Sequence, residues 1–278
     1  ISVLRIFVTF MMMTGFLSSL RLDWGSVLRA IFNTARAGSG GVPPLVQCSG
    51  IDFASEMTFS LMLPLFVPCV PCVFLAVWAF GRCVRCRGVT GVTVGGVSKG
   101  HFFANSCVAV SYLIWPALVT QALRVLDCSV DINGVRFVAS DVSVACYEGA
   151  HANLRLGAMF NLFVVVPALP AILWWRLRHF PLGPGTFNRK HLYFIYGGYR
   201  EGFAYWEVVV LVRKFIVLSI AVFLADTQRT FGLQVTAALC VMCFATGLQL
   251  LYTPYQNRTE QLLETLSLGG ITFSCMVG

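Results

Sequence analysis

The hydrophobic residues of this chain are gathered in long uninterrupted runs, and polar residues fill the segments between them. A run of about 20 apolar residues is the length that an α-helix needs to cross ~30 Å of hydrocarbon. The runs are continuously apolar and do not alternate, which favours helices over a transmembrane β-barrel. Runs near this length predict seven membrane spans, at residues 3–20, 57–80, 102–123, 156–175, 208–225, 231–252 and 262–278.

The predicted fold class is therefore all-α, a polytopic bundle of about seven transmembrane helices that forms one domain over residues 1–278. The composition agrees, because 57% of the residues are apolar and only 12% are charged, outside the range of soluble domains. The chain begins at Ile1 and stops at Gly278 inside an apolar run. We therefore expect a fragment of a longer chain, with the first and last spans truncated.

Charges in the connecting segments predict their side of the membrane, because short cytoplasmic loops carry an excess of Lys and Arg. Residues 81–101 hold four cations and no acid, and residues 176–202 hold five cations and one acid. Residues 21–56 and 124–155 balance their cations with acids. The first two loops are predicted to be cytoplasmic and the last two extracellular or lumenal, in a plasma membrane or a secretory-pathway organelle.

Two adjacent cations, Arg213 and Lys214, interrupt the fifth span. One interpretation is topological anchoring, with both side chains extending to the cytoplasmic headgroups. The other places them in a buried polar cluster with Glu207, which precedes Lys214 by seven residues and so lies on nearly the same helical face. Tyr205 and Trp206, at the same end of the span, are typical of an interfacial aromatic belt.

Eleven cysteines are spread along the chain. Cys128 and Cys146 fall in a loop assigned to the outside, where an oxidising compartment permits a disulfide, although Cys48 in the other external loop is a competing partner. Cys83 and Cys86 lie among basic residues at the membrane face, where palmitoylation competes with plain unmodified thiols. Their CxxC spacing, together with that of Cys69 and Cys72, resembles a zinc pattern. Along a straight helix, however, the two pairs are too far apart to share a metal.

The sequence offers little chemistry beyond this. The four histidines lack ligand spacing, and no nucleophile and base can be paired, so we expect neither an enzyme nor a cofactor or metal site. The net charge of +8 is explained by topology and requires no nucleic-acid partner. The expected partners are the lipid bilayer, cations, a second copy of the chain in a homo-oligomer, and extracellular domains upstream in the same polypeptide.

Several segments together resemble a family: "LRIFVTFMMMTGFLSSLRLDWGSVLRAIF", "VASDVSVACYEGAH", "VVPALPAILWWRL", "YGGYREGFAYWEVVVLVRKFIVLSIAVF" and "LYTPYQNRTEQLLETLSL". They look like the C-terminal polytopic region of very large protist and algal surface proteins with cysteine-rich GCC2/GCC3-type or EGF-like repeats. The apicomplexan cysteine-repeat modular proteins are similar, and the membrane region is loosely similar to TRP-like and polycystin-like channels. The Tyr-Trp-Glu of residues 205–207 followed by Arg213 and Lys214 is the most distinctive piece.

The resemblance implies a membrane module of a large surface protein that acts as a TRP-like cation channel. One alternative is a non-conducting anchor or sensor for an adhesive, cysteine-rich ectodomain. A TRP-type pore needs a re-entrant segment between two late spans, and residues 226–230 leave little room for one. A transporter is a further alternative, because several spans contain prolines that could break helices at a midplane site. A G-protein-coupled receptor is disfavoured, since its second connection would be extracellular and residues 81–101 are basic.

Overall fold

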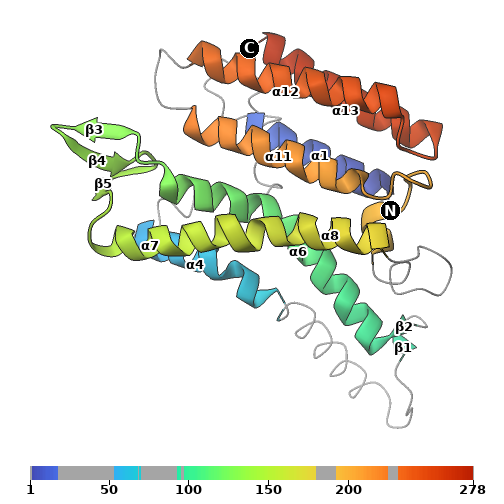
Figure 1. Cartoon of the computed structure of the whole chain (residues 1–278), viewed down its shortest axis with the longest axis horizontal. Helices are drawn as coiled ribbons and strands as arrows, with labels where there is room; N and C mark the ends of the chain where they lie inside the picture. Colours follow the sequence, from blue (N-terminus) through green and yellow to red (C-terminus); the bar gives the residue numbers. More distant parts are fainter. Residues whose placement is uncertain are drawn as a thin grey trace, which may run out of the picture.

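The computed structural model describes residues 2–17, 53–67, 69, 93–94, 97–179, 192–224 and 231–277. These residues are mostly helical, with two small antiparallel sheets (Figure 1). The elements are α1 (Ser2–Leu17), α4 (Phe53–Phe66), β1 (Thr93–Val94), β2 (Val97–Ser98), α6 (Lys99–Leu126), β3 (Val130–Ile132), β4 (Val135–Val138), β5 (Asp141–Ala145), α7 (Gly149–Phe160), the π-helix η1 (Asn161–Val165), α8 (Val166–His179), α10 (Tyr193–Tyr196), α11 (Trp206–Phe223), α12 (Phe231–Tyr252) and α13 (Arg258–Val277).

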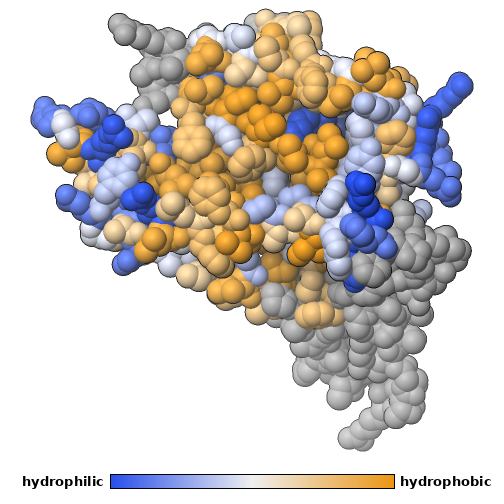
Figure 2. All heavy atoms as spheres, viewed as in Figure 1, coloured by the Kyte–Doolittle hydropathy of each residue, from blue (hydrophilic) through white to orange (hydrophobic). Residues whose placement is uncertain are grey.

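The molecular surface is what a membrane-embedded bundle requires. On the face in Figure 2, hydrophobic residues fill the middle and hydrophilic residues gather at two opposite ends. Large apolar side chains such as Leu251 and Phe244 are 80% and 70% exposed. In the described part of the chain, three helical segments are long and apolar enough to cross a membrane: Ser106–Leu126, Gly149–His179 and Gly232–Tyr252. These three segments are compatible with a membrane location.

The long helices run roughly along one direction, so the connections collect at two ends of the bundle (Figure 1). The sheet of β3, β4 and β5, together with the start of α7, lies at one end. The start of α1 and the turn between α12 and α13 lie at the other. Segments 81–101 and 176–202, expected to be cytoplasmic, are only partly described, but β2 and the end of α8 lie on the side opposite the three-stranded sheet.

Three groups of buried side chains hold the helices together. The largest joins α6, α8 and α11 through residues such as Trp115, Leu173 and Leu211. A second joins α1 and α11 to α12 and α13, and the third packs α4 against α6 and α7. Each group thus contains side chains from helices that are far apart in sequence. In lipid, where the hydrophobic effect does not drive helices together, such van der Waals packing makes their association specific.

Prolines shape two of the long helices. Pro116 lies inside α6, whose ribbon changes direction in Figure 1, as expected where a residue without an N–H interrupts the backbone ladder. Pro170 in α8 cannot donate to the carbonyl of Val166, four residues earlier. The indole of Trp115 donates to that carbonyl instead, at 2.8 Å. The bond satisfies a buried polar group and ties α6 to α8.

We predict that Trp115→Phe lowers the free energy of unfolding by about 1–2 kcal/mol, because the Val166 carbonyl loses its donor while the aromatic bulk is largely kept. Fluorescence-monitored unfolding of the purified chain in mixed micelles measures this change. Trp175→Phe is the matched control, since Trp175 is 50% exposed and should change stability by less than about 0.5 kcal/mol. Equal losses in both variants would contradict this role of the indole.

The three-stranded sheet is formed by a short meander, with strand order β3–β4–β5 and antiparallel pairing throughout. Asn133 and Gly134 connect β3 to β4 with φ values of 56° and 84°. A two-residue connection with both φ values positive is the type I′ geometry, and Asn-Gly is its preferred sequence. The N–H of Gly134 also donates to the Asp131 carboxylate at 2.9 Å. This end of the bundle therefore carries a compact polar structure outside the helices.

The observed helices agree in position with most of the predicted spans. The predicted span 231–252 has the bounds of α12, and spans 102–123 and 156–175 lie inside α6 and the continuous segment α7–η1–α8. Spans 3–20, 208–225 and 262–278 correspond to α1, α11 and α13, apart from terminal residues outside the described part of the chain. Span 57–80 begins within α4, and its second half lies outside the described residues. Strands were not expected, because the prediction followed apolar runs of about 20 residues and the strands are only two to five residues long.

Candidate functional site

The most distinctive feature of the interior is a buried group of polar side chains around Glu207. We call it the Glu207 cluster; its members are Arg5, Thr9, Tyr112, Tyr199, Glu207, Lys214 and Tyr255. They come from α1, α6, the segment before α11, α11 itself and the turn between α12 and α13. Each has a relative exposure of 8% or less. Five parts of the chain therefore meet at one polar centre.

The carboxylate of Glu207 is the acceptor at the centre of this group. Tyr112 donates to Oε1 at 2.5 Å, and Tyr199 donates to Oε2 at 2.8 Å. The guanidinium Nε of Arg5 lies 3.4 Å from Oε2. Glu207 is in the first turn of α11, where the positive end of the helix dipole also favours an anion. A carboxylate that is only 1% exposed thus has two hydroxyl donors and a cation around it.

Lys214 is the second charged member and lies two turns further along α11. Its Nζ donates to the hydroxyl of Tyr112 at 3.0 Å and to Oγ1 of Thr9 at 3.3 Å. It also lies 4.8 Å from the centroid of the Tyr112 ring, a cation–π distance. The Tyr112 hydroxyl accepts from Lys214 and donates to Glu207, so it links the two charges across the helix face.

Arg5 brings the first helix into the same group. Its guanidinium lies 4.6 Å above the ring of Tyr199 and donates to the backbone carbonyl of Gly197 at 3.2 Å, in addition to pairing with Glu207. Its side chain is 2% exposed, so the ion pair is screened very little by water. Together Arg5 and the Lys214–Thr9 bond fix α1 against α11.

Tyr199 and Tyr255 connect the cluster to the backbone at its end of the bundle. Their rings are 4.8 Å apart and their residues form an isolated antiparallel bridge. The N–H of Arg200 donates to the Pro254 carbonyl and that of Gln256 to the Gly198 carbonyl, both at 2.8 Å. Burial raises the pKa of both phenols. They remain protonated donors at neutral pH, and the stability they contribute falls as pH rises above about 10, where unfolded tyrosines ionise.

Arg213 points to a different partner from its neighbour. Its guanidinium donates to Oε1 of Glu264 on α13 at 3.1 Å, and the two side chains are 8% and 4% exposed. A further hydrogen-bond chain runs from the Trp206 indole to Gln249 on α12 and from there to Gln261 on α13. α11 therefore has separate polar ties to α1, α6, α12 and α13.

This arrangement couples the helices to one another. Arg5 pairs with Glu207 and Arg213 pairs with Glu264. The amine of Lys214 is held by the hydroxyls of Tyr112 and Thr9. The side chains are enclosed, and they meet each other rather than a solvent-filled route. What the cluster can do is favour one arrangement of the helices, because separating any two of them would leave a charge unpaired in a low-dielectric interior.

The two interpretations of Arg213 and Lys214 can now be compared with their positions. Both side chains are buried and directed into the bundle, as in the buried-cluster interpretation. The grouping differs from the expected one, because Arg213 pairs with Glu264 and only Lys214 joins Glu207. Tyr205 is 41% exposed, compatible with an interfacial position. Trp206 is 6% exposed, and its indole packs into the bundle against Phe203 and the tyrosine that ends α12. An interfacial depth for Trp206 stays a prediction.

Comparisons with known proteins give a limited picture. No family model matches the chain, and no solved structure matches it. It is similar to the cysteine repeat modular protein A of Toxoplasma gondii, with 25% identity over an alignment of 183 residues. The alignment covers 59% of this chain and 6% of the relative. The chain thus spans a small part of that relative's length, and the similarity supports a loose link to the cysteine-rich apicomplexan proteins.

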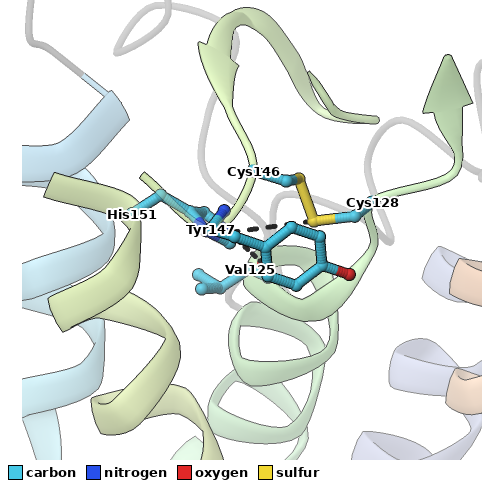
Figure 3. The surroundings of a disulfide bond; sticks show 5 residues. All are labelled: Val125, Cys128, Cys146, Tyr147 and His151. Atoms are coloured by element: carbon cyan, nitrogen blue, oxygen red, sulfur yellow. Dashed lines mark hydrogen bonds between the residues drawn. A yellow bond between two sulfur atoms is a disulfide. The ribbon is translucent and has the colours of Figure 1, made fainter. Parts of the chain in front are cut away.

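The disulfide expected in the external loop is present. Cys128 and Cys146 are bonded, and they join the end of α6 to the end of β5 (Figure 3). His151 lies beneath them, 1% exposed: its Nδ1 accepts from the Tyr147 N–H at 3.0 Å and its Nε2 donates to the Val125 carbonyl at 2.9 Å. The imidazole therefore connects the start of α7 to the last turns of α6 below the disulfide.

Within the described part of the chain, one group of possible ligand residues is close enough together to hold a metal ion: Cys128, Cys146 and His151. Zinc is bound by thiolates and imidazole nitrogens. Here each sulfur is committed to the other, and both ring nitrogens of His151 have backbone partners. The site is structural in this oxidised form. Cys83 and Cys86, the candidate palmitoylation sites, and Cys48 lie outside the described residues.

Some of the buried polar residues could be found from sequence and others could not. Arg5 and Glu264 are charged residues within apolar runs, a signal that marks intramembrane function or pairing. The tyrosines at 112, 199 and 255 carry no such signal, because tyrosine is common at membrane interfaces. Their role depends on which helices pack together, and this was not accessible from spacing along one chain.

Proposed function

We propose that this chain is the membrane-embedded module of a larger surface protein, in which the Glu207 cluster holds the helices in one arrangement and so provides a firm anchor for the rest of the polypeptide. The observation that carries the proposal is the enclosed cluster, which joins α1, α6, α11 and the α12–α13 turn through one ion pair and the hydrogen bonds of three tyrosines. The apolar outer surface supports insertion in lipid, and the similarity to the Toxoplasma gondii protein supports membership of a much longer chain.

The proposal includes seven crossings, with the Glu207 cluster at the cytoplasmic end. The basic loops and the bundle ends support this topology. The start of α4, which includes the last residues of one segment expected outside, lies at the same end of the bundle as the three-stranded sheet, which belongs to the other (Figure 1). Under it, α1 begins on the cytoplasmic side. An extracellular domain joined before α1 then needs one further crossing between the two.

The topology is tested with the chain inserted in sealed microsomes, whose outer surface is the cytoplasmic face. Trypsin added outside should cleave in 81–101 and 176–202 and spare Arg136, which lies in the exposed strand β4. In the same system Val135→Thr creates an Asn-Gly-Thr glycosylation acceptor at Asn133 in the β3–β4 turn, and it should gain one glycan. Cleavage at Arg136 in sealed vesicles, with no glycan on Val135→Thr, would contradict the topology.

A TRP-like cation channel is the second candidate, favoured by five ionisable side chains within helices of the bundle: Arg5, Glu207, Arg213, Lys214 and Glu264. Their contacts support the anchor more strongly, because Arg5 and Arg213 each pair with an acid and Lys214 is held by two hydroxyls. Current across a planar bilayer that contains the full-length parent protein separates the two. The anchor predicts no selective current from folded protein, whereas cation-selective current that Glu207→Gln alters would favour the channel.

A further inference from the structure

A hollow on the opposite side of the bundle from the Glu207 cluster has no part in the function proposed above. It lies between α4 and the α7–η1 segment and has a volume of about 580 Å³. Its lining is mostly apolar, with residues such as Leu61, Met62, Leu65 and Phe160. Leu65 and Phe160 are 69% and 59% exposed, so the hollow opens to the outer surface that faces lipid in a membrane-embedded bundle.

Asn161 is the unusual member of this lining. It is 5% exposed, and it begins the π-helix η1. Its Nδ2 donates to the Leu61 carbonyl at 3.2 Å and to the Gly157 carbonyl at 3.1 Å. Because both neighbours are acceptors, the orientation of the amide is fixed, with Oδ1 as the remaining acceptor. That oxygen is buried and has no hydrogen-bond partner among the described residues.

A buried acceptor without a donor is costly, and π-helical turns are frequent at functional sites. The ladder of backbone hydrogen bonds in this helix is interrupted here, because Pro167 follows η1 and has no N–H. A ligand that supplies one donor would satisfy Oδ1. The oxygen is covered by neighbouring atoms, so a small movement of side chains in the lining must admit the donor. Met62 and Leu65 belong to this lining and are 47% and 69% exposed, which leaves their side chains room to move.

The lining defines the chemistry of the ligand. Among the described residues it contains no ionisable side chain, so a phosphate or a carboxylate would meet no counter-charge from them. Thr58 and Asn153 are the other polar side chains among the described residues of the lining. The hydroxyl of Thr58 already donates to the Ala54 carbonyl at 2.7 Å, and Asn153 is exposed. Asn161 lies 12 residues beyond Gly149, about 18 Å along a helix of 1.5 Å rise per residue. A hydroxyl that reaches this depth must belong to an otherwise apolar body.

We propose that the hollow between α4 and α7–η1 binds a neutral lipid of the sterol class, with its single hydroxyl donating to Oδ1 of Asn161 and its apolar body against Leu61, Met62, Leu65 and Phe160. Asn161 is then the residue that selects a hydroxyl, and the surrounding apolar side chains select the body. The hydroxyl would bond to Asn161 in the α7–η1 segment, and the apolar body would contact α4. A bound sterol would therefore hold α4 and the α7–η1 segment together.

The test uses the purified chain in lipid nanodiscs labelled by a photoreactive cholesterol analogue, with the labelled residues mapped by mass spectrometry. Labels should fall on α4 and α7–η1. Cholesterol should compete roughly three- to tenfold better than cholestenone, whose 3-keto group cannot donate, as expected for one neutral hydrogen bond to a buried group. The comparison needs no variant and therefore does not depend on how a mutation folds.

Asn161→Leu should remove the preference for cholesterol over cholestenone, and Thr58→Val, in the same lining, should keep it. Equal competition by the two sterols in the unmodified chain would overturn the proposal. So would labels confined to other helices, or a photoreactive phosphatidylcholine that labels the hollow and is not displaced by cholesterol. Each of these results can be obtained whether or not the chain acts as an anchor.

Discussion

Replacing Glu207 by Gln is expected to lower the free energy of unfolding by about 3–5 kcal/mol, the cost of removing one partner from a buried ion pair. The variant leaves the cations of Arg5 and Lys214 in the interior without the acid that balances them. The new amide group also carries N–H donors toward a region where Arg5, Tyr112 and Tyr199 already donate. Shape is nearly unchanged, so the loss reports charge and hydrogen bonding and not packing.

The change is measured by unfolding of the purified chain in mixed micelles. Glu260→Gln is the matched control, because Glu260 lies in the first turn of α13, is only half-buried and forms no ion pair with the described residues. We expect less than about 1 kcal/mol from it. Equal and negligible losses in the two variants would mean that the carboxylate of Glu207 is not what holds the cluster.

Loss of the Cys128–Cys146 disulfide is the second large effect, and we expect it to lower stability by about 3 kcal/mol in the chain-entropy model for a loop of this size. The two residues are 18 positions apart and enclose the whole three-stranded sheet. Without the bond, the sheet is held mainly by its short strands and by His151. We expect local opening of residues 128–146 before the helices unfold.

Hydrogen exchange of the Cys128→Ala/Cys146→Ala variant measures this directly, since amides of β3, β4 and β5 should lose protection while those of α12 keep it. Cys240→Ala/Cys243→Ala is the matched control, because both of those cysteines are exposed and free. Unchanged protection in the sheet, or an equal loss in both double variants, would show that the disulfide does not order this segment.

Much of the helical architecture could be predicted from the sequence, because the membrane imposes a strong length requirement on apolar runs. The bounds 231–252 follow from uninterrupted hydrophobicity between two polar segments. Charge bias assigned the loop of Cys128 and Cys146 to an oxidising side, and the disulfide there was expected on that ground. The seven crossings and the orientation themselves stay predictions.

The interior could be predicted only in part, since helical spacing says which residues share a face but not what lies opposite. The seven-residue spacing of Glu207 and Lys214 predicts that their side chains lie on the same face of the helix. The partner of Arg213 could not be predicted in this way, because Glu264 is 51 residues away on another helix. The packing of Trp206 was not predicted for a related reason: the sequence gives no sign that its indole faces the bundle, where the amide of Gln249 accepts its N–H.

The central claim is that Arg5 and Glu207 interact across the bundle and so fix α1 to α11. A double-mutant cycle of Arg5→Met and Glu207→Gln, with the free energy of unfolding measured for all four proteins in the same micelles, tests it most directly. The account predicts a coupling energy above about 1.5 kcal/mol, so that the double variant is clearly more stable than the sum of the two single losses predicts. Losses that add within about 0.5 kcal/mol would contradict it, because residues that do not interact behave additively.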